Sequence, residues 1–291
     1  MRLNLPLLAV LLCLSAAARA ATPAAAPPPG DPHAWCAAVT KVIPQIKPAT
    51  CASAQLRPWA KSVDGRPILL SEFRPAGGSL ARVLVVGGIH GDELTSVSIV
   101  FRWIERLKET SGEAAQYHWR VIPLLNPDGL LARPRPTRVN ARGVDLNRNF
   151  PTDNWQDEAH HYWSVSTRRD PRRFPGVAPR SEPESSWLHY EITTFKPDVI
   201  ISVHAPYSVL DFDGPPAVKP PERFGRLKLH RLGVYPGSLG NFGGLKEGIP
   251  VVTLELPHAL DMPSEKELAQ VWRDMQNWLS TNVADRKPAN Q

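Results

Sequence analysis

The segment Gly-Gly-Ile-His-Gly-Asp-Glu at residues 87–93 decides how the rest of the chain is interpreted. It follows the apolar residues 83–86, which predict a buried strand, and it precedes a predicted helix at residues 94–109. His90 and Glu93 therefore lie on a turn at the carboxyl end of a strand, where open α/β sheets form ligand sites. An imidazole and a carboxylate can hold zinc, and one further protein ligand leaves a position for water. Taken alone, the segment is explained better by an ordinary glycine-rich turn, since short motifs have many false positives.

Strands and helices alternate outward from this segment. Residues 181–184 and 264–267 both have the Ser-x-x-Glu spacing of a capping box, so each predicts the start of a helix. The Asp-Gly pair at residues 64–65 predicts a turn. Near-continuous apolar strands separated by helices indicate a mostly parallel sheet that is covered on both faces. The expected strands are 68–73, 82–87, 119–125, 199–203 and 251–255, and the helices after residue 93 are 94–109, 181–195 and 265–281.

The first 20 residues have the pattern of a secretory signal peptide. A positive start precedes an apolar stretch, and Ala-Arg-Ala at residues 18–20 matches a cleavage site. The apolar stretch is short for a membrane span, so we expect cleavage rather than an uncleaved anchor. Removal of residues 1–20 leaves 271 residues and lowers the formal net charge from +6 to +4. Residues 21–34 are rich in Ala and Pro and are expected to be a disordered linker.

Two cysteines remain in the mature chain, within an expected N-terminal cap at residues 35–60. Cys36 and Cys51 are expected to form a disulfide, because secreted proteins mature in oxidising compartments. Two buried free thiols are the alternative. Residues 61–285 would form the catalytic domain. The chain has no Lys/Arg run interleaved with aromatic residues, so no nucleic-acid partner is expected.

Two further residues stand at the ends of predicted strands. His204 follows the strand at 199–203, and with His90 and Glu93 it would complete a His-Glu-His zinc set. Glu255 ends the apolar strand at 251–255, where a carboxylate is costly to bury unless it faces a site. Beside a zinc-bound water it would serve as general base. The alternatives are a strand-end histidine that caps local backbone and a surface glutamate.

A long polar section at residues 126–180 supplies candidate substrate ligands. Arg148 can grip a carboxylate with two hydrogen bonds, and Asn147 can add a directional one. Arg138 could stabilise an oxyanion. The alternative is a solvated basic loop, which is the expected state of most other arginines here and of the histidines at 160–161. Loops of this length are usually functional or disordered.

Taken together, these residues resemble the zinc carboxypeptidases of the pancreatic carboxypeptidase A type. The resemblance rests on His90-x-x-Glu93, His204 and Glu255, and on Asp-Leu-Asn-Arg-Asn-Phe-Pro at residues 145–151. Gly-Ile-His-Gly-Asp-Glu at 88–93 and Leu-Asn-Pro-Asp-Gly at 125–129 resemble the bacterial murein peptide amidase branch. The resemblance covers about residues 60–280.

The resemblance implies an α/β/α sandwich with a mixed, mostly parallel eight-stranded sheet. It implies Zn²⁺ as the cofactor and assigns a role to each matching residue. The metal ligands would be His90, Glu93 and His204; Glu255 would be the base; Arg138 would polarise the scissile carbonyl; Asn147 and Arg148 would bind the terminal carboxylate, with Tyr235 as the mobile tyrosine. Digestive carboxypeptidases have Arg just before the ligand Glu, where this chain has Asp92, which could pair with a substrate ammonium group.

The expected protein is a secreted or periplasmic zinc metallopeptidase that hydrolyses murein peptides. The expected bond is the γ-D-glutamyl–meso-diaminopimelate amide, and the partner is a peptide with a free C-terminal carboxylate. Alternatives are a carboxypeptidase for ordinary C-terminal residues or other muropeptide stems, and an amidohydrolase of the aspartoacylase or desuccinylase kind. A catalytically inactive wall-binding module is disfavoured, because a binder would not need Glu255. No stable membrane anchor is expected.

Overall fold

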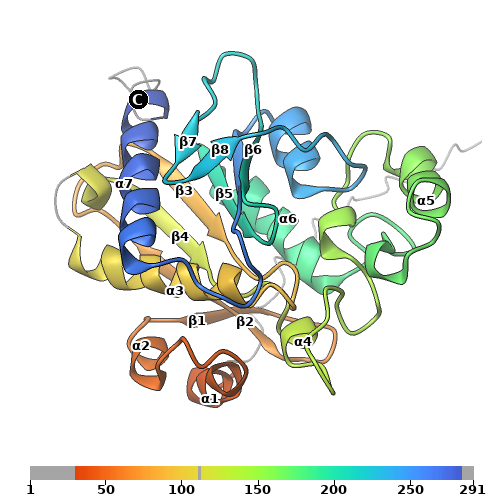
Figure 1. Ribbon diagram of the computed structural model, residues 1–291, viewed down its shortest axis with the longest axis horizontal. Helices are drawn as coiled ribbons and strands as arrows, with labels where there is room; N and C mark the ends of the chain where they lie inside the picture. The colour runs from red at the N-terminus through yellow and green to blue at the C-terminus, as the bar shows by residue number, and fades with distance from the viewer. Residues whose placement is uncertain (1–29, 111–112, 284–291) are drawn as a thin grey trace, which may run out of the picture.

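A mixed sheet of nine strands forms the centre of the protein in a computed structural model that describes residues 30–110 and 113–283 (Figure 1). The strand order is β1-β2-β4-β3-β5-β9-β6-β8-β7. The central strands β4, β3, β5 and β9 are parallel, whereas β2, β6 and β8 run in the opposite direction. The expected mixed sheet is therefore confirmed, with nine strands in place of eight. Four of the neighbouring strand pairs are parallel and four are antiparallel.

Seven α-helices and several shorter helical turns connect these strands within the described ranges. The strands are β1 (Arg57–Lys61), β2 (Pro67–Phe73), β3 (Arg82–Val86), β4 (His118–Ile122), β5 (Val199–His204), β6 (Val209–Asp213), β7 (Arg223–Phe224), β8 (Leu227–Leu229) and β9 (Val251–Glu255). The α-helices are α1 (Pro32–Val42), α2 (Pro48–Ala52), α3 (Leu94–Glu109), α4 (Pro127–Leu130), α5 (Trp155–Val165), α6 (Pro183–Phe195) and α7 (Glu265–Asn282). Shorter helical turns are η1 (Glu113–Gln116), η2 (Leu146–Arg148), η3 (Pro171–Arg173) and the π-helix η4 (Asn241–Lys246).

Both faces of the sheet are buried, because successive side chains of a strand point to opposite sides. In β3, Val83 and Val85 belong to a core with α3 and α7, whereas Leu84 and Val86 belong to a second core with α6. Helices therefore cover the sheet on both faces (Figure 1). This arrangement is the α/β/α sandwich that the family resemblance implied, and the apolar strands correctly predicted a sheet covered on both faces.

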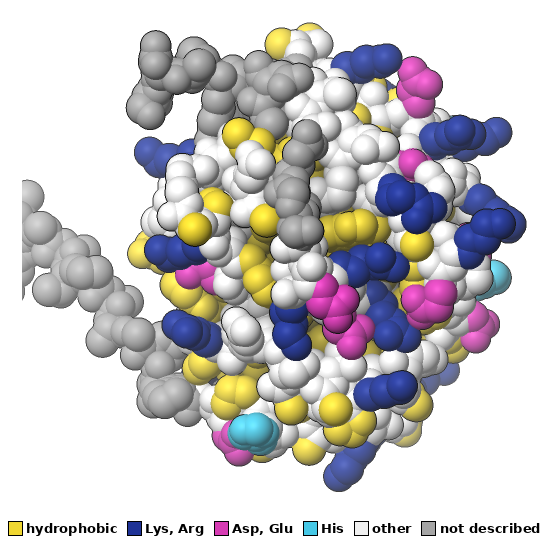
Figure 2. Space-filling model, turned by 90° about the vertical axis from the view of Figure 1, so that its left-hand side faces the viewer, with side chains coloured by type: hydrophobic (Ala, Val, Ile, Leu, Met, Phe, Trp, Pro, Cys, Tyr) yellow, Lys and Arg dark blue, Asp and Glu magenta, His cyan; other side chains and the backbone are white. Residues whose placement is uncertain are grey.

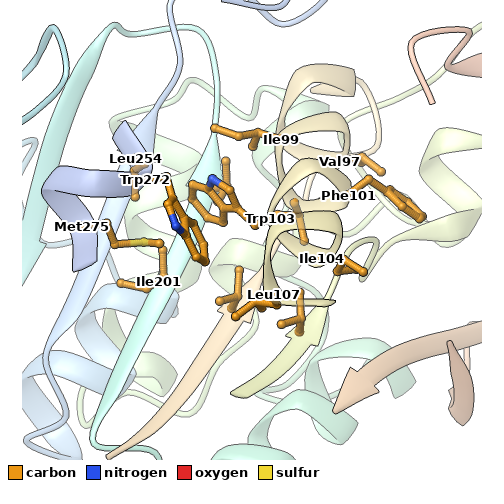
Figure 3. Packing of buried hydrophobic residues seen from close by; sticks show 14 of the residues in the cluster. Val97, Ile99, Phe101, Trp103, Ile104, Leu107, Ile201, Leu254, Trp272 and Met275 are labelled. Atoms are coloured by element: carbon orange, nitrogen blue, oxygen red, sulfur yellow. The ribbon is translucent and has the colours of Figure 1, made fainter. Parts of the chain in front are cut away.

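The larger core is filled by aromatic and branched side chains from α3, α7 and the sheet. Trp103 of α3 and Trp272 of α7 have ring centroids 6.0 Å apart, and they pack near Met275, Ile201 and Leu254 (Figure 3). Large buried rings contribute much apolar area to a core. This packing holds α3 rigidly against β3, so the turn between them is well supported.

The face at the left of Figure 1 carries basic and acidic side chains mixed together (Figure 2). On the helices, Arg102 of α3 pairs with Glu105 at 3.2 Å and with Glu265 of α7 at 3.1 Å. Exposed pairs of this kind contribute little stability singly. Within the described ranges, no helix is both long and apolar enough to cross a membrane.

The N-terminal helices are joined by the expected disulfide. Cys36 and Cys51 are bonded, with their Cα atoms 5.7 Å apart. α1 begins at Pro32, three residues earlier than the expected cap, and Trp35 contacts Phe101 of α3. The cap therefore shares its core with the rest of the protein. The expected signal peptide and most of the expected linker lie outside the described residues.

Several local predictions are confirmed and others are wrong. The Asp-Gly turn at 64–65 connects β1 and β2, although β1 itself was not predicted. Ser264 and Glu267 form the predicted capping box of α7. The box predicted at Ser181 does not form, because α6 begins after Glu182 and Ser181 donates its hydroxyl to that neighbour at 2.8 Å. The short strands β6, β7 and β8 were also not predicted.

Candidate metal and catalytic site

Three segments that are far apart in the sequence meet at the carboxyl ends of β3, β5 and β9. β5 pairs with β3 on one side and with β9 on the other, and His204 lies directly opposite Glu255 in the β5–β9 register. His90 and Glu93 lie on the turn after β3, immediately before α3. The structure therefore brings together the strand ends that carry His90, Glu93, His204 and Glu255.

His90, Glu93 and His204 form a compact buried cluster. Nδ1 of His90 lies 2.7 Å from Oε1 of Glu93, and Nδ1 of His204 lies 3.0 Å from Oε2 of the same carboxylate. The two Nδ1 atoms are 3.1 Å apart. One ligand atom from each residue falls within 4.8 Å of the others. Two imidazole nitrogens and one carboxylate oxygen are the donor set of many catalytic zinc sites.

Asp145 orients this cluster, although the sequence did not single it out as a functional residue. Its Oδ1 lies 3.1 Å from Nε2 of His90, and its Oδ2 accepts a 3.0 Å hydrogen bond from Nε of Arg138. A proton on Nε2 that is shared with this carboxylate leaves the Nδ1 lone pair of His90 free for a metal ion. The signal in the sequence was an acidic residue two positions before the expected carboxylate clamp.

The electrostatics of the cluster favour a charged Glu93 and a neutral His204. Burial would raise the pKa of Glu93, but the charges and hydrogen bonds of His90 and His204 lower it far below its usual range. Burial lowers the pKa of His204 below that of a free imidazole. Burial would lower the pKa of His90, but the carboxylates of Glu93 and Asp145 raise it, so a metal ion would have to displace a proton from His90. The donor set of two imidazoles and one carboxylate fits a divalent metal ion such as zinc.

Glu255 is a buried carboxylate beside this cluster. It ends β9, its side chain is 7% exposed, and its Oε2 has no hydrogen-bond partner among the described residues. Burial, followed by the charge of Glu93, raises its pKa to about 8. A buried acid with a raised pKa and a free oxygen has the properties of a proton-transfer group.

Arg148, Asn147 and Tyr235 line the same cavity as the cluster. Nη1 of Arg148 donates to the backbone carbonyl of Asn147 at 2.6 Å, and its Nε has no partner in the described chain. Its guanidinium carbon lies 4.6 Å from the ring centre of Tyr235, whose hydroxyl donates to the carbonyl of Leu232 at 3.0 Å. The stacked and buried guanidinium is held in place as an anion-binding group.

A cavity of about 510 Å³ joins these groups and is of the size usual for small-ligand sites. The predicted residues that line it are His90, Glu93, Arg138, Asn147, Arg148, His204, Tyr235 and Glu255. Sequence reasoning did not single out other lining residues, among them Tyr162, Asp170, Arg173, Asp211 and Asp213. The section 152–180 therefore forms part of the cavity wall. Its His160 packs against the rings of Trp155 and Phe174 instead of being fully solvated.

Asp92 is placed apart from this cavity. It lines a neighbouring apolar cavity of about 1050 Å³, which shares Arg138 with the first. Its Oδ2 lies 2.8 Å from Nη2 of Arg172. A substrate ammonium group would have to displace or join that ion pair, and the proposed contact between Asp92 and substrate stays a prediction.

Comparison with known proteins identifies the family. Residues 44–215 match the sequence profile of the zinc carboxypeptidase family. The chain belongs to the zinc carboxypeptidase family. Membership implies a hydrolase with a bound metal ion, typically zinc, and the cluster of His90, Glu93 and His204 has the chemistry to hold one.

Curated relatives and solved structures agree with this membership. Murein peptide amidase A of Vibrio campbellii is 33% identical over 220 residues, which are 72% of this chain and 83% of the relative. Murein peptide amidase A of Escherichia coli K12 is 33% identical over 155 residues, 53% of this chain and 60% of the relative. A murein-tripeptide amidase from Escherichia coli O157 has a TM-score of 0.56 at 24% identity, covering 81% of this chain and 93% of that one. Carboxypeptidase A from Helicoverpa armigera has a TM-score of 0.63 at 18% identity. The match covers 87% of this chain and 72% of the carboxypeptidase chain. These two structures support the fold.

Proposed function

We propose that this protein is a zinc-dependent peptidase that hydrolyses murein peptides at the γ-D-glutamyl–meso-diaminopimelate amide. The observation that carries the proposal is one cavity that holds three features: the buried His-Glu-His cluster, the carboxylate of Glu255 with its unpaired Oε2, and the unpaired Nε of Arg148. The His-Glu-His cluster can bind a metal ion, Glu255 can transfer a proton, and Arg148 can bind a terminal carboxylate. The two murein peptide amidase A relatives favour a murein substrate.

In this proposal His90, Glu93 and His204 hold the metal ion. When bound, zinc supplies a Lewis acid for the scissile carbonyl and lowers the pKa of a water molecule. Glu255 removes a proton from the attacking water and delivers it to the leaving nitrogen. Arg138, held by Asp145, donates hydrogen bonds to the carbonyl oxygen as negative charge develops there.

The other half of the cavity binds the end of the substrate. The free Nε of Arg148 faces no protein acceptor in the described chain, so a substrate carboxylate would satisfy it. The side-chain oxygen of Asn147 accepts from the backbone N–H of Leu239 at 2.8 Å, which leaves the amide nitrogen free to donate to the same carboxylate. Tyr235 covers the guanidinium and restricts its motion. These contacts favour substrates with a free C-terminal carboxylate.

We also propose that the enzyme acts outside the cytoplasm. The proposal rests on the signal-peptide pattern at residues 1–20 and on the Cys36–Cys51 disulfide, since disulfides persist in oxidising compartments. Murein is found in such a compartment, so the localisation agrees with the proposed substrate. Cell fractionation with mass spectrometry of the N-terminus tests this point, and a protein that stays in the cytoplasm with Met1 intact would contradict it.

The activity is tested with purified mature protein of known zinc content and the tripeptide L-Ala-γ-D-Glu-meso-diaminopimelate. The expected result is release of free diaminopimelate by the wild type and loss of at least 1000-fold in kcat for Glu255→Gln, since the variant lacks the proton carrier. Zinc content should stay the same in the variant. If the zinc-loaded wild type releases no diaminopimelate but cleaves an ordinary peptide with a C-terminal amino acid, the murein assignment is wrong and the carboxypeptidase alternative stands.

A further inference from the structure

A second cavity lies beside the catalytic one, and the proposed mechanism does not use it. It has a volume of about 1050 Å³ and shares Arg138 with the catalytic cavity of about 510 Å³. In the proposed function Arg138 contacts the oxygen of the scissile carbonyl, whereas Arg148 lines the first cavity alone. The acyl side of the substrate, which points away from Arg148, therefore lies next to the second cavity.

The wall of the second cavity is mostly apolar and comes from segments that are far apart in the sequence. Val42 ends α1, Leu260 follows β9, and Trp163 and Phe174 belong to the section 152–180. The side chain of Leu260 is 58% exposed, so apolar surface at the edge of the cavity is open to solvent. Exposed apolar surface around a concave site indicates a ligand with an apolar face.

Trp163 is held in this wall as a fixed platform. Its Nε1 donates to the backbone carbonyl of Asp170 at 2.8 Å. Its ring centre lies 5.0 Å from that of Phe174 and 6.4 Å from that of His160. Because the indole N–H is satisfied inside the protein, the ring offers apolar carbon surface to the cavity. A flat surface of this kind suits the C–H face of a sugar ring, and little side-chain entropy is lost on binding because the ring is already fixed.

The charged groups of the second cavity disfavour a free amino terminus. Among the described residues that line it, three are arginines and one is an acid. The acid, Asp92, lies 2.8 Å from Nη2 of Arg172, and Arg138 is bonded to Asp145. The exposed Arg135 has no carboxylate partner in the described chain, so the remaining charge is positive. An ammonium group is costly to place beside an apolar wall that has no free acid.

The acyl group of the proposed substrate is L-Ala-γ-D-Glu, and its alanine nitrogen is either free or acylated. In a free tripeptide this nitrogen is a protonated amino terminus. In a stem peptide on glycan it is an uncharged amide, which joins alanine to the lactyl group of N-acetylmuramic acid. The α-carboxylate that a γ-linked glutamate retains is opposite in sign to Arg135 in both forms. The second cavity therefore suits the acylated form better.

The size of the second cavity also exceeds what the dipeptide needs. Sites for drug-sized ligands usually have volumes of about 300–1000 Å³, and this cavity is at the upper end of that range. Alanine carries one methyl group as its side chain. A dipeptide alone would leave the apolar surface of Trp163 and Leu260 in contact with water, whereas an N-acetylated sugar would cover it.

We propose that the second cavity binds the muramyl sugar, so that the enzyme prefers stem peptides still attached to glycan over free tripeptides. The inference rests on the proposed function for the bond that is cleaved, and it adds what is recognised on the acyl side of that bond. The sugar ring lies against Trp163, and its apolar groups contact the wall near Leu260. The preference agrees with the proposed location outside the cytoplasm, where murein is polymeric.

The test uses three substrates that differ only on the acyl side. All contain L-Ala-γ-D-Glu-meso-diaminopimelate, and the alanine nitrogen is free in the first, acetylated in the second and linked to N-acetylmuramic acid in the third. For the zinc-loaded wild type we expect kcat/KM to rise by about threefold from the free to the acetylated form, and by about tenfold more for the muramoyl form. Equal values for the last two, or a free tripeptide that is the best substrate, would overturn the inference.

Two variants locate the effect in the second cavity. Trp163→Leu keeps an apolar side chain but loses the flat ring, and Leu260→Ser removes a side chain that is too exposed to be needed for folding. The muramoyl-to-acetyl ratio of kcat/KM should fall to about one in the first and by about threefold in the second. Leu245→Ser is the matched control with an unchanged ratio, because Leu245 is 53% exposed and lines neither cavity. Wild-type ratios in both cavity variants would contradict the assignment.

Ligands without the scissile bond separate this inference from the proposed function. Calorimetry compares N-acetylmuramoyl-L-Ala-D-Glu with N-acetyl-L-Ala-D-Glu on the zinc-loaded wild type, and the expected Kd is about tenfold lower for the muramoyl ligand. Trp163→Leu should bind the two ligands equally. A sugar preference in a protein that cleaves none of the three substrates supports the subsite and contradicts the proposed function. Equal Kd values in the wild type overturn the inference, even if the murein tripeptide is cleaved.

Discussion

For His90 to bind a metal ion through Nδ1, its ring proton must lie on Nε2. His90 contacts Glu93 through Nδ1 and Asp145 through Nε2, so its two ring nitrogens have different environments. Asp145 is buried and also accepts a hydrogen bond from Arg138. One carboxylate thereby orients a proposed metal ligand and a proposed oxyanion donor at once. Residues that act through a ligand in this way have measurable effects on metal affinity.

We expect Asp145→Asn to lower zinc affinity by about 10- to 100-fold. An amide in place of the carboxylate no longer stabilises the tautomer of His90 that has its proton on Nε2, so Nδ1 is less available. Titration against a competing chelator measures the change. Asp157→Asn, at an exposed position on α5, is a matched control and should keep the wild-type affinity. Equal affinities for the Asp145→Asn protein and the wild type would show that the contact does not tune the metal site.

A second prediction concerns the guanidinium of Arg148. Arg148→Lys keeps the positive charge but removes the planar fork and the stacking on Tyr235. We expect kcat/KM to fall by about 100-fold for a substrate with a free terminal carboxylate. For the same substrate with a C-terminal carboxamide, kcat/KM should be low in both proteins. The Arg148→Lys substitution should therefore change kcat/KM little for that substrate. Arg273→Lys on α7 is the control. An equal loss on both substrates would assign Arg148 a structural role instead.

At the scale of an element, the N-terminus of α6 buries several carboxylates together. Glu184 accepts hydrogen bonds from the backbone of Val63 at 3.1 Å and from the side chain of Asn140 at 3.3 Å. Nearby Asp128 is bonded to Ser62 and to Arg66. Burial raises the pKa of Glu184 to about 7, and the charge of Asp128 adds to the effect. These contacts tie α6 to the β1–β2 turn and to Asn140 in the loop before η2.

The raised pKa predicts how stability depends on pH. The unfolded chain releases the proton of a glutamate near pH 4.3, whereas folded Glu184 keeps it to about pH 7. Between these two pH values the folded state binds more protons than the unfolded state. The contribution of Glu184 to the free energy of unfolding therefore falls as pH rises from 4.3 to about 7, by on the order of 3 kcal/mol. Denaturant unfolding at pH 5 and pH 8 should show a smaller decline for Glu184→Gln than for the wild type. Glu247→Gln, at an exposed position, should follow the wild type. Parallel profiles for wild type and Glu184→Gln would contradict the assignment.

At the scale of the whole molecule, the sequence predicted what depends on local pattern. Apolar runs identified β3, β5 and β9, and 3.6-residue periodicity identified α3 and α7. The positions of His90, Glu93, His204 and Glu255 at or just after the ends of these strands could also be predicted. β6, β7 and β8 were not found, because short strands near a sheet edge are stabilised by long-range pairing that leaves little local signal. Asp213 was missed for the same reason, since its place in the cavity follows from the β6–β9 register.

The proposed metal site would also link the stability of the whole fold to zinc, because its proposed ligands come from the turn after β3 and from the end of β5. An ion that binds only the folded state stabilises it by about 4 kcal/mol at a free concentration 1000 times its Kd. We expect removal of zinc by a chelator to lower Tm by about 10 °C for a domain of this size, and added zinc to restore it. His204→Ala should show no zinc-dependent shift, since it lacks one ligand. Glu255→Gln should keep the full shift, because Glu255 is proposed to carry protons and not to bind the metal. A wild type whose Tm ignores the chelator, or a Glu255→Gln protein without a shift, would contradict this division of roles.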